Sequence, residues 1–239
     1  MNSGSDGAVM LERPHTTVVL AMSADGKISD KMRSHPRFGS QADFDHLERQ
    51  VAAADAVLFG AGTLRAGGSA MRVLNPALIQ GRVQSGKPEQ PIQIVCTRSG
   101  EIDPTLRFFG QPIPRYLLTT PTGAKRWEGT TAFDEILAAE TGDRNINWHH
   151  AFAALHRRNI QQIAVLGGGE VVAALLEVDL IDELHLTICP VLLGSEKAPT
   201  PVAGVGFTQD LAPKLELLNV TQVGQELFLH YRVCRVTVP

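Results

Sequence analysis

The chain has 239 residues, of which 44% are hydrophobic and 20% charged, a size and composition that suit one sizeable α/β domain. Its formal charge of −3 offers no general attraction to nucleic acid or to an anionic membrane, and no apolar run reaches the length of a membrane-spanning helix. The three cysteines are far apart and none is in a C-x-x-C pair; Cys96 and Cys189 lie in apolar runs, which predicts buried thiols and a cytoplasmic protein.

The first predicted strand covers residues 15–22 and ends in a turn that carries charged side chains. We interpret residues 1–12 as a disordered leader and residues 13–239 as the domain. The strand runs into Ser23-Ala-Asp-Gly26, followed by Lys27, and open α/β sheets usually bind ligands beyond their strand ends. Asp25 and Lys27 could therefore orient a substrate or relay a proton, although aspartate before glycine is also common in plain turns.

A basic loop up to residue 39 leads to a predicted amphipathic helix over residues 41–54. Ser40 is the expected N-cap, with Asp43 placed to complete a capping box. Residues 55–59 form the next short apolar strand, and residues 66–88, rich in glycine and proline, are predicted to be one long loop. Arg65 and Arg72 flank this loop and could meet a substrate phosphate; solvated surface arginines are the alternative.

Further strands are predicted over residues 91–96 and 114–119. Thr97-Arg98-Ser99 follows the first of these and supplies a guanidinium and two hydroxyls, which could bind a ribose 2′-phosphate and so select NADP over NAD. The alternative is an ordinary solvated turn. Residues 133–139 lean towards helix in composition, but their length suits a short edge strand. A helix is expected over residues 148–158.

The most informative stretch is Ile163-Ala-Val-Leu-Gly-Gly-Gly-Glu-Val-Val172, in which a strand runs into three glycines and a helix begins near Glu170. Such a junction can hold phosphate, because glycine lets the backbone approach the anion and the helix N-terminus attracts it. A lone glycine run is weak evidence, since a turn without ligand looks the same. However, residues 60–63 repeat the arrangement, so two strand ends could hold opposite sides of one phosphate-bearing ligand.

The last third of the chain predicts a strand over residues 182–193, a loop, and a hairpin of residues 214–223 and 226–236. Together these elements predict a single domain with a mixed, mostly parallel sheet, helices on both faces and a C-terminal antiparallel hairpin. The absence of G-x-G-x-x-G argues against a standard Rossmann fold. The eight histidines are scattered along the sequence, so we expect no metal site.

Three stretches together resemble the reductase domain of riboflavin biosynthesis: SADGK at 23–27, LFGAGTLRA at 58–66 and AVLGGGEVVAALLEVDLIDELHLTICPVLLG at 164–194. That family forms the C-terminal half of the bifunctional pyrimidine deaminase-reductase, also occurs as a stand-alone reductase, and is similar in fold to dihydrofolate reductase. The resemblance implies a homodimer that uses NADPH to reduce a phosphorylated aminopyrimidine. The substrate would be 5-amino-6-(5-phosphoribosylamino)uracil or its diamino-pyrimidinone counterpart, whose ribosylamino group becomes ribitylamino.

The resemblance also implies roles for individual residues. Ser23, Asp25 and Lys27 fall where the loop after the first strand would meet nicotinamide and substrate. We assign catalysis to Asp25 and Lys27, and substrate binding to Ser23 together with Arg65 and Arg72. The residues expected to bind the cofactor are Gly60, Gly62, Thr63, Thr97, Arg98, Ser99, Gly167, Gly168, Gly169, Glu170 and Val171.

Two positions depart from the family pattern. Where family members usually read Asp-Asp-Pro or Asp-Asn-Pro, this chain has Gly67-Gly68-Ser69, and where they often carry a glutamate before the glycine run, it has Leu166. Both acids are expected to contact the substrate. The alternatives are therefore a dihydrofolate reductase-like NADPH reductase with another substrate, or a nucleotide-binding protein without catalysis.

Overall fold

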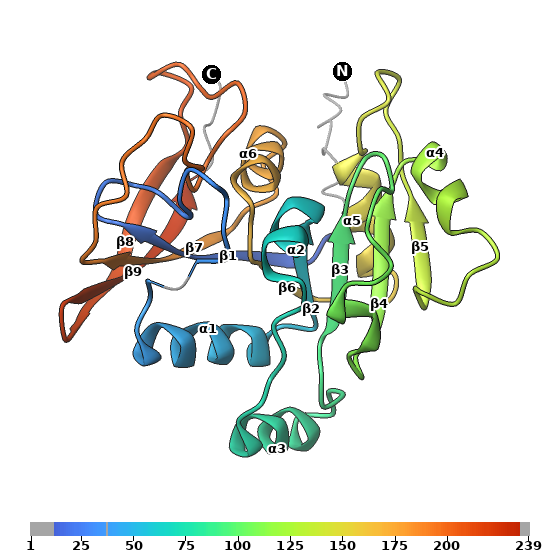
Figure 1. Cartoon of the computed structure of the whole chain (residues 1–239), viewed down its shortest axis with the longest axis horizontal. Helices are drawn as coiled ribbons and strands as arrows, with labels where there is room; N and C mark the ends of the chain where they lie inside the picture. Colours follow the sequence, from blue (N-terminus) through green and yellow to red (C-terminus); the bar gives the residue numbers. More distant parts are fainter. Residues whose placement is uncertain (1–11, 37, 235–239) are drawn as a thin grey trace, which may run out of the picture.

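The computed structural model describes residues 12–36 and 38–234. In this part of the chain nine strands form one sheet in the order β5-β4-β3-β2-β6-β1-β7-β9-β8 (Figure 1). The strands are β1 (His15–Ser23), β2 (Ala56–Gly60), β3 (Ile92–Cys96), β4 (Arg115–Thr119), β5 (Glu135–Ala138), β6 (Gln162–Val165), β7 (Glu183–Cys189), β8 (Lys214–Val223) and β9 (Glu226–Cys234). The helices are α1 (Gln41–Ala53), α2 (Ala61–Gly67), α3 (Pro76–Gln84), α4 (Pro121–Ala124), α5 (Trp148–His156) and α6 (Gly169–Glu177), with 3-10 turns at Arg107–Gly110 and Lys125–Trp127.

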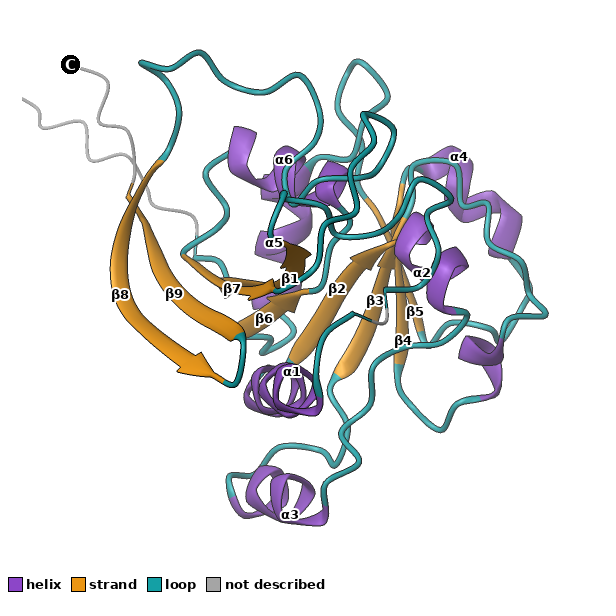
Figure 2. Ribbon diagram, turned by 60° about the vertical axis from the view of Figure 1, so that its left-hand side comes forward, coloured by secondary structure: helices purple, strands orange, loops and turns teal. Residues whose placement is uncertain are grey.

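All neighbouring strands from β5 to β7 pair in parallel, whereas β9 is antiparallel to both β7 and β8. Helices cover both faces: α5 and α6 pack into one apolar cluster, and α1 and α2 into another. Figure 2 shows α5 and α6 on one side of the sheet and α1 on the other, with the β8–β9 hairpin curving away at one end. The predicted mixed sheet with a C-terminal hairpin is therefore confirmed. Among the described helices, none is both long and apolar enough to cross a membrane.

Most element predictions are confirmed, including the buried thiols of Cys96 and Cys189. Of the two alternatives left open for residues 133–139, the structure has the edge strand, β5. The prediction of one long loop over residues 66–88 was wrong, because α3 lies within that range. Asn75 caps this helix by accepting from the Ala77 amide at 2.9 Å, and Pro76 occupies its first turn. Most of the predicted leader, and residues 235 and 236 of the predicted hairpin, lie outside the described residues.

The structure also differs from the sequence-based predictions at the end of β7 and at the N-cap of α1. The strand predicted over residues 182–193 ends at Cys189, because Pro190 has no amide to continue the ladder. Ser40 does cap α1, but Asp43 does not complete a capping box. Instead the Ser40 amide donates to Glu226 Oε1 at 2.8 Å, and its hydroxyl donates to Glu226 Oε2 at 2.5 Å. A residue 186 positions away thus completes the cap.

Asp55 connects the N-terminal ends of β2 and β6, the two strands that are followed by the glycines of residues 60–62 and 167–169. Its Oδ2 accepts from the amides of Gln161 and Gln162 at 2.8 and 2.9 Å, and Oδ1 lies 2.9 Å from Lys87 Nζ. Burial raises the pKa of Asp55, but the hydrogen bonds from Lys87 and the two amides outweigh it, so the pKa lies below its usual value. Ionised Asp55 therefore stabilises the fold above about pH 4, and this contribution is lost as the pH falls through the lowered pKa.

We expect Asp55→Asn to lower the free energy of unfolding by about 1–2 kcal/mol at pH 7, because the charge-assisted hydrogen bonds are lost. Below the folded pKa the wild-type carboxyl is protonated as well, so the two proteins should approach equal stability. Urea unfolding of both proteins at pH 7 and at the lowest pH where each still folds measures the difference. A stability gap that does not shrink with falling pH would contradict the assignment.

Candidate functional site

A cavity of about 1250 Å³ opens where β2 and β6 end and beside the N-terminal part of α1. Its walls come from β1, the junctions of β2 with α2 and of β6 with α6, and two loops. The first loop follows β1 (residues 28–36 and 38–39), and the second follows β7 (residues 196–203). The cavity therefore lies where ligands of open parallel sheets usually bind.

The two glycine-ended strands contact each other at the cavity. β2 and β6 are neighbours, and the Gly60 amide donates to the Gly167 carbonyl at 2.9 Å. The Gly167–Gly168 peptide is cis. A Cβ on Gly60 would lie 3.0 Å from Val171 Cγ2, and one on Gly168 would lie 3.5 Å from Thr63 Oγ1. Side chains at these positions would narrow the cleft between the two segments.

The helices that begin at this cleft differ from the others at their N-termini. Side chains of Ser40, Asn75, Thr120 and Asn147 cap α1, α3, α4 and α5. Within the described chain, α2 and α6 have glycine N-caps and no side-chain cap. Their first backbone amides are therefore free of a competing side chain and suited to bind an anion.

The structure brings most of the expected cofactor residues together. The predicted residues that line the cavity are Gly60, Gly62, Thr63, Gly168, Gly169, Glu170 and Val171. Gly167 is buried behind them. Residues 97–99 follow β3, whose last residue Cys96 pairs with Gly60, so they begin at the same sheet edge one strand away. The exposed Arg98 guanidinium donates to Asn145 Oδ1 at 3.1 Å. The cofactor-binding roles of all these expected residues stay predictions.

Ser23, Asp25 and Lys27 lie outside the cavity lining and hold a turn together. Ser23 Oγ donates to Asp25 Oδ1 at 2.6 Å and accepts from the Lys27 amide at 2.9 Å. Asp25 also accepts from the amides of Leu193 and Gly194 at 3.0 and 2.6 Å. The Ser23 hydroxyl and these amides lower the pKa of Asp25 to about 2. The catalytic roles of Asp25 and Lys27 stay predictions, and the geometry favours an anchoring role for Asp25.

This anchor sets the position of both loops that form the cavity walls. Asp25 holds the start of the loop after β7, and the Ile28 amide donates to the Pro199 carbonyl at 2.9 Å. On the far side, the Ala203 amide donates to the Gly169 carbonyl at 3.1 Å. The loop after β7 therefore connects the first strand's loop to the glycine end of α6.

Several residues that line the cavity were not among those expected from the sequence. Arg65 and Arg72 are not part of the cavity lining. Its cationic side chains are those of Lys31, Arg33 and Lys197. The basic composition directly after the first strand was the available signal. Asp43 also lines the cavity, and burial raises the pKa of its carboxyl. This side chain holds its proton to higher pH than an exposed aspartate does.

The two departures from the family pattern lie at the cavity as well. Leu166 lines it and packs against the apolar cluster of α1 and α2, and Ser69 lines it from the segment after α2. Phe44 and Leu47 of α1 extend the apolar part of the wall. Gly67 lines the cavity too, so this wall has leucine and glycine where the resemblance leads one to expect acids.

A protein-family model and curated proteins match most of this chain. The family model described as RibD C-terminal domain matches residues 14–229. The 2,5-diamino-6-ribosylamino-4(3H)-pyrimidinone 5′-phosphate reductase of Archaeoglobus fulgidus is 26% identical over 89% of this chain and 95% of its own length. The protein of the same description from Methanothermobacter thermautotrophicus is 25% identical over 92% and 99% of the two chains.

Solved structures resemble the whole fold. A pyrimidine reductase-like protein from Corynebacterium diphtheriae superposes with a TM-score of 0.78 at 24% identity, covering 96% of this chain and 97% of that one. The riboflavin biosynthesis reductase of Saccharomyces cerevisiae gives a TM-score of 0.67 at 17% identity, with coverage of 98% and 93%. At these identities the two structures support the same architecture.

Proposed function

The chain belongs to the RibD C-terminal domain family, and from this membership we propose that it is the NADPH-dependent reductase of riboflavin biosynthesis. It reduces the ribosylamino group of a phosphorylated aminopyrimidine to ribitylamino, in line with the reductase names of the Archaeoglobus and Methanothermobacter relatives. The observation that carries this proposal is the cleft between two glycine-ended strands, each followed by a helix without a side-chain cap. A homodimer and a cytoplasmic location are part of the proposal through the resemblance.

The residues at the cleft fit a dinucleotide. Backbone amides at the starts of α2 and α6 offer hydrogen bonds to a pyrophosphate, and the missing side chains of Gly60 and Gly168 leave room for it. Arg98, one strand away, supplies a guanidinium for the 2′-phosphate that distinguishes NADPH from NADH. When bound, NADPH supplies the hydride. The protein contributes by holding the two reactants in a productive orientation.

The loop after β1 supplies charge for the substrate. Lys31 and Arg33 are exposed and line the cavity, so we assign them to the substrate's phosphate group. Asp43 lines the same cavity, and burial raises the pKa of its carboxyl. It is our candidate for the group that exchanges a proton with the substrate nitrogen during reduction.

We expect the double substitution Lys31→Ala, Arg33→Ala to raise the KM for the phosphorylated aminopyrimidine about tenfold, because two cations near one phosphate are lost. The KM for NADPH should stay within about twofold of wild type. Steady-state kinetics with each reactant varied in turn measures both. Lys125→Ala, Arg126→Ala removes the same two residue types at an exposed site outside the cavity lining and serves as the control. Equal increases in both KM values would contradict the phosphate role.

A second candidate function follows from Leu166 and Gly67. Because these residues form cavity wall where acids were expected, a reductase of the same fold with a less polar substrate remains the alternative. Titration of the protein with NADPH, followed by turnover of the phosphoribosylaminopyrimidine, separates the readings. Binding with turnover supports the proposal, and binding without turnover supports another substrate or a non-catalytic protein. Absence of NADPH binding would contradict both reductase readings.

A further inference from the structure

Four of the chain's eight histidines gather around β7, and none of the four lines the glycine-lined cavity. They are His15 on β1, His46 on α1, His185 on β7 and His230 on β9. Their sequence spacing gave no hint of this, because the four positions come from four separate elements. A cavity of about 370 Å³ adjoins this cluster and is lined by His46, His185 and His230.

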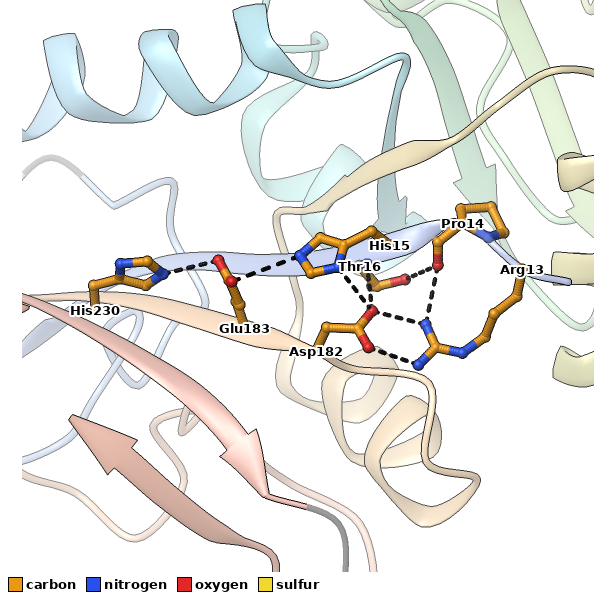
Figure 3. Close-up of polar contacts among 7 residues, drawn as sticks. All are labelled: Arg13, Pro14, His15, Thr16, Asp182, Glu183 and His230. Atoms are coloured by element: carbon orange, nitrogen blue, oxygen red, sulfur yellow. Dashed lines mark hydrogen bonds and ion pairs between the residues drawn. The ribbon is translucent and has the colours of Figure 1, made fainter. Parts of the chain in front are cut away.

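Glu183 joins the cluster and makes it chemically mixed. His15 and His230 lie on either side of its carboxylate (Figure 3), with Nε2 atoms 3.8 and 2.8 Å from its oxygens. The neighbouring Asp182 instead forms a bidentate pair with Arg13, with both N–O distances at 2.7 Å. Glu183 therefore contacts two of the histidines, whereas Asp182 contacts His15 alone among them, with Nδ1 3.6 Å from Oδ2.

The strand geometry directs three of these side chains to one point. Glu183 and His185 are two residues apart on β7, so they project from the same face of the sheet. His230 lies directly opposite His185 on the antiparallel strand β9. Their rings stack with centroids 4.0 Å apart and planes 13° apart. One ligand atom from each of Glu183, His185 and His230 lies within 4.8 Å of the others.

We propose that Glu183, His185 and His230 form a binding site for Zn²⁺, with one coordination position open towards the 370 Å³ cavity. Two imidazoles and one carboxylate are a ligand set that zinc takes in proteins. At ligand distances of about 2.0–2.2 Å, tetrahedral ligand atoms stand roughly 3.4 Å apart. To reach that spacing the two imidazole rings turn out of their stacked arrangement towards the ion, which replaces the hydrogen bond between Glu183 and His230.

The surroundings of the site are consistent with a single ion. Asp45 and Arg49 of α1 both line the cavity, so they contribute one charge of each sign. His46 contacts His185 with ring centroids 5.1 Å apart and borders the open position. An ion bound here links β7 to β9 and thereby fastens the C-terminal hairpin to the parallel part of the sheet. The site is independent of the proposed reductase activity.

Calorimetric titration of the tag-free, full-length chain with ZnCl₂ tests the proposal. We expect one Zn²⁺ per chain, and at least tenfold weaker binding in His185→Gln and in His230→Gln. His150→Gln removes an exposed histidine on α5 and should bind like wild type. Circular dichroism of each variant confirms that it is folded. Absence of uptake by wild type, or unchanged uptake in the folded variants, would overturn the proposal.

A second measurement on wild-type protein covers the case in which a variant does not fold. Diethyl pyrocarbonate modifies accessible neutral imidazoles, and modified peptides can be identified by mass spectrometry. With Zn²⁺ present, His185 and His230 should be modified at least tenfold more slowly, whereas His150 should react at its original rate. Equal protection of all three, or protection of none, would contradict the assignment.

Discussion

Replacing Arg98 with alanine is expected to weaken NADPH binding about ten- to hundredfold while NADH binding changes less than about twofold. The physical reason is that the two cofactors differ only in the 2′-phosphate, and a charge-assisted hydrogen bond contributes about 1.5–3 kcal/mol. Arg98 is exposed and lies one strand from Gly60, and its contact with Asn145 holds the guanidinium at the sheet edge.

Fluorescence titration of wild type, Arg98→Ala and Arg98→Lys with both cofactors measures this effect. The lysine variant keeps the charge but loses the bidentate geometry, so its NADPH affinity should fall between the other two. Arg126→Ala, which removes another exposed arginine, should leave both affinities unchanged. Equal losses for NADPH and NADH in Arg98→Ala would show that the residue does not recognise the 2′-phosphate.

Gly169→Ala should have the largest effect on the fold around the site. A Cβ at this position would overlap the Thr200 carbonyl oxygen and lie 3.3 Å from Ala203. Because the obstacle is backbone, either α6 or the loop after β7 must move. We expect the free energy of unfolding to fall by about 2–3 kcal/mol, as for overpacked interiors. NADPH affinity should fall as well, since the amides at the start of α6 are displaced.

Gly81→Ala provides the matched control, because Gly81 lies inside α3 and a Cβ there meets no atom of the described residues within 4 Å. Alanine at this helical position should stabilise the protein by about 0.5–1 kcal/mol without changing NADPH affinity. Urea unfolding and cofactor titration of both variants give the comparison. Wild-type stability of Gly169→Ala would mean that the loop after β7 does not pack against α6 as described.

Short-range features of the chain were predictable because local physics decides them. The apolar strands before Gly60 and Gly167, the Ser40 cap and the alternating C-terminal hairpin depend on periodicity and on backbone hydrogen bonding over a few residues. The helix α3 was missed although Asn75-Pro76 is an N-cap followed by a first-turn proline. Its glycine content and weak amphipathic pattern made a loop the simpler interpretation.

Contacts between distant segments were decided only by the tertiary structure. Asp25 follows the first strand, yet its partners at Leu193 and Gly194 are more than 160 residues away. The sequence showed a carboxylate at a strand end, but not that loop amides occupy its oxygens. In the same way, the strand predicted from residue 182 does not reveal that His185 faces His230. Strand order and register determine such pairs.

The two glycine-ended strands, the family to which they belong and the arginine that follows the neighbouring strand can be identified from adjacent residues alone. Which of the candidate side chains share a cavity depends on the fold. The fold places Lys31, Arg33 and Asp43 in the cavity lining, leaves Arg65 and Arg72 outside it, and brings four scattered histidines together around β7. The reason is that chain connectivity and the pairing order of β1, β6 and β7 set these distances, and neither is written in any single stretch of sequence.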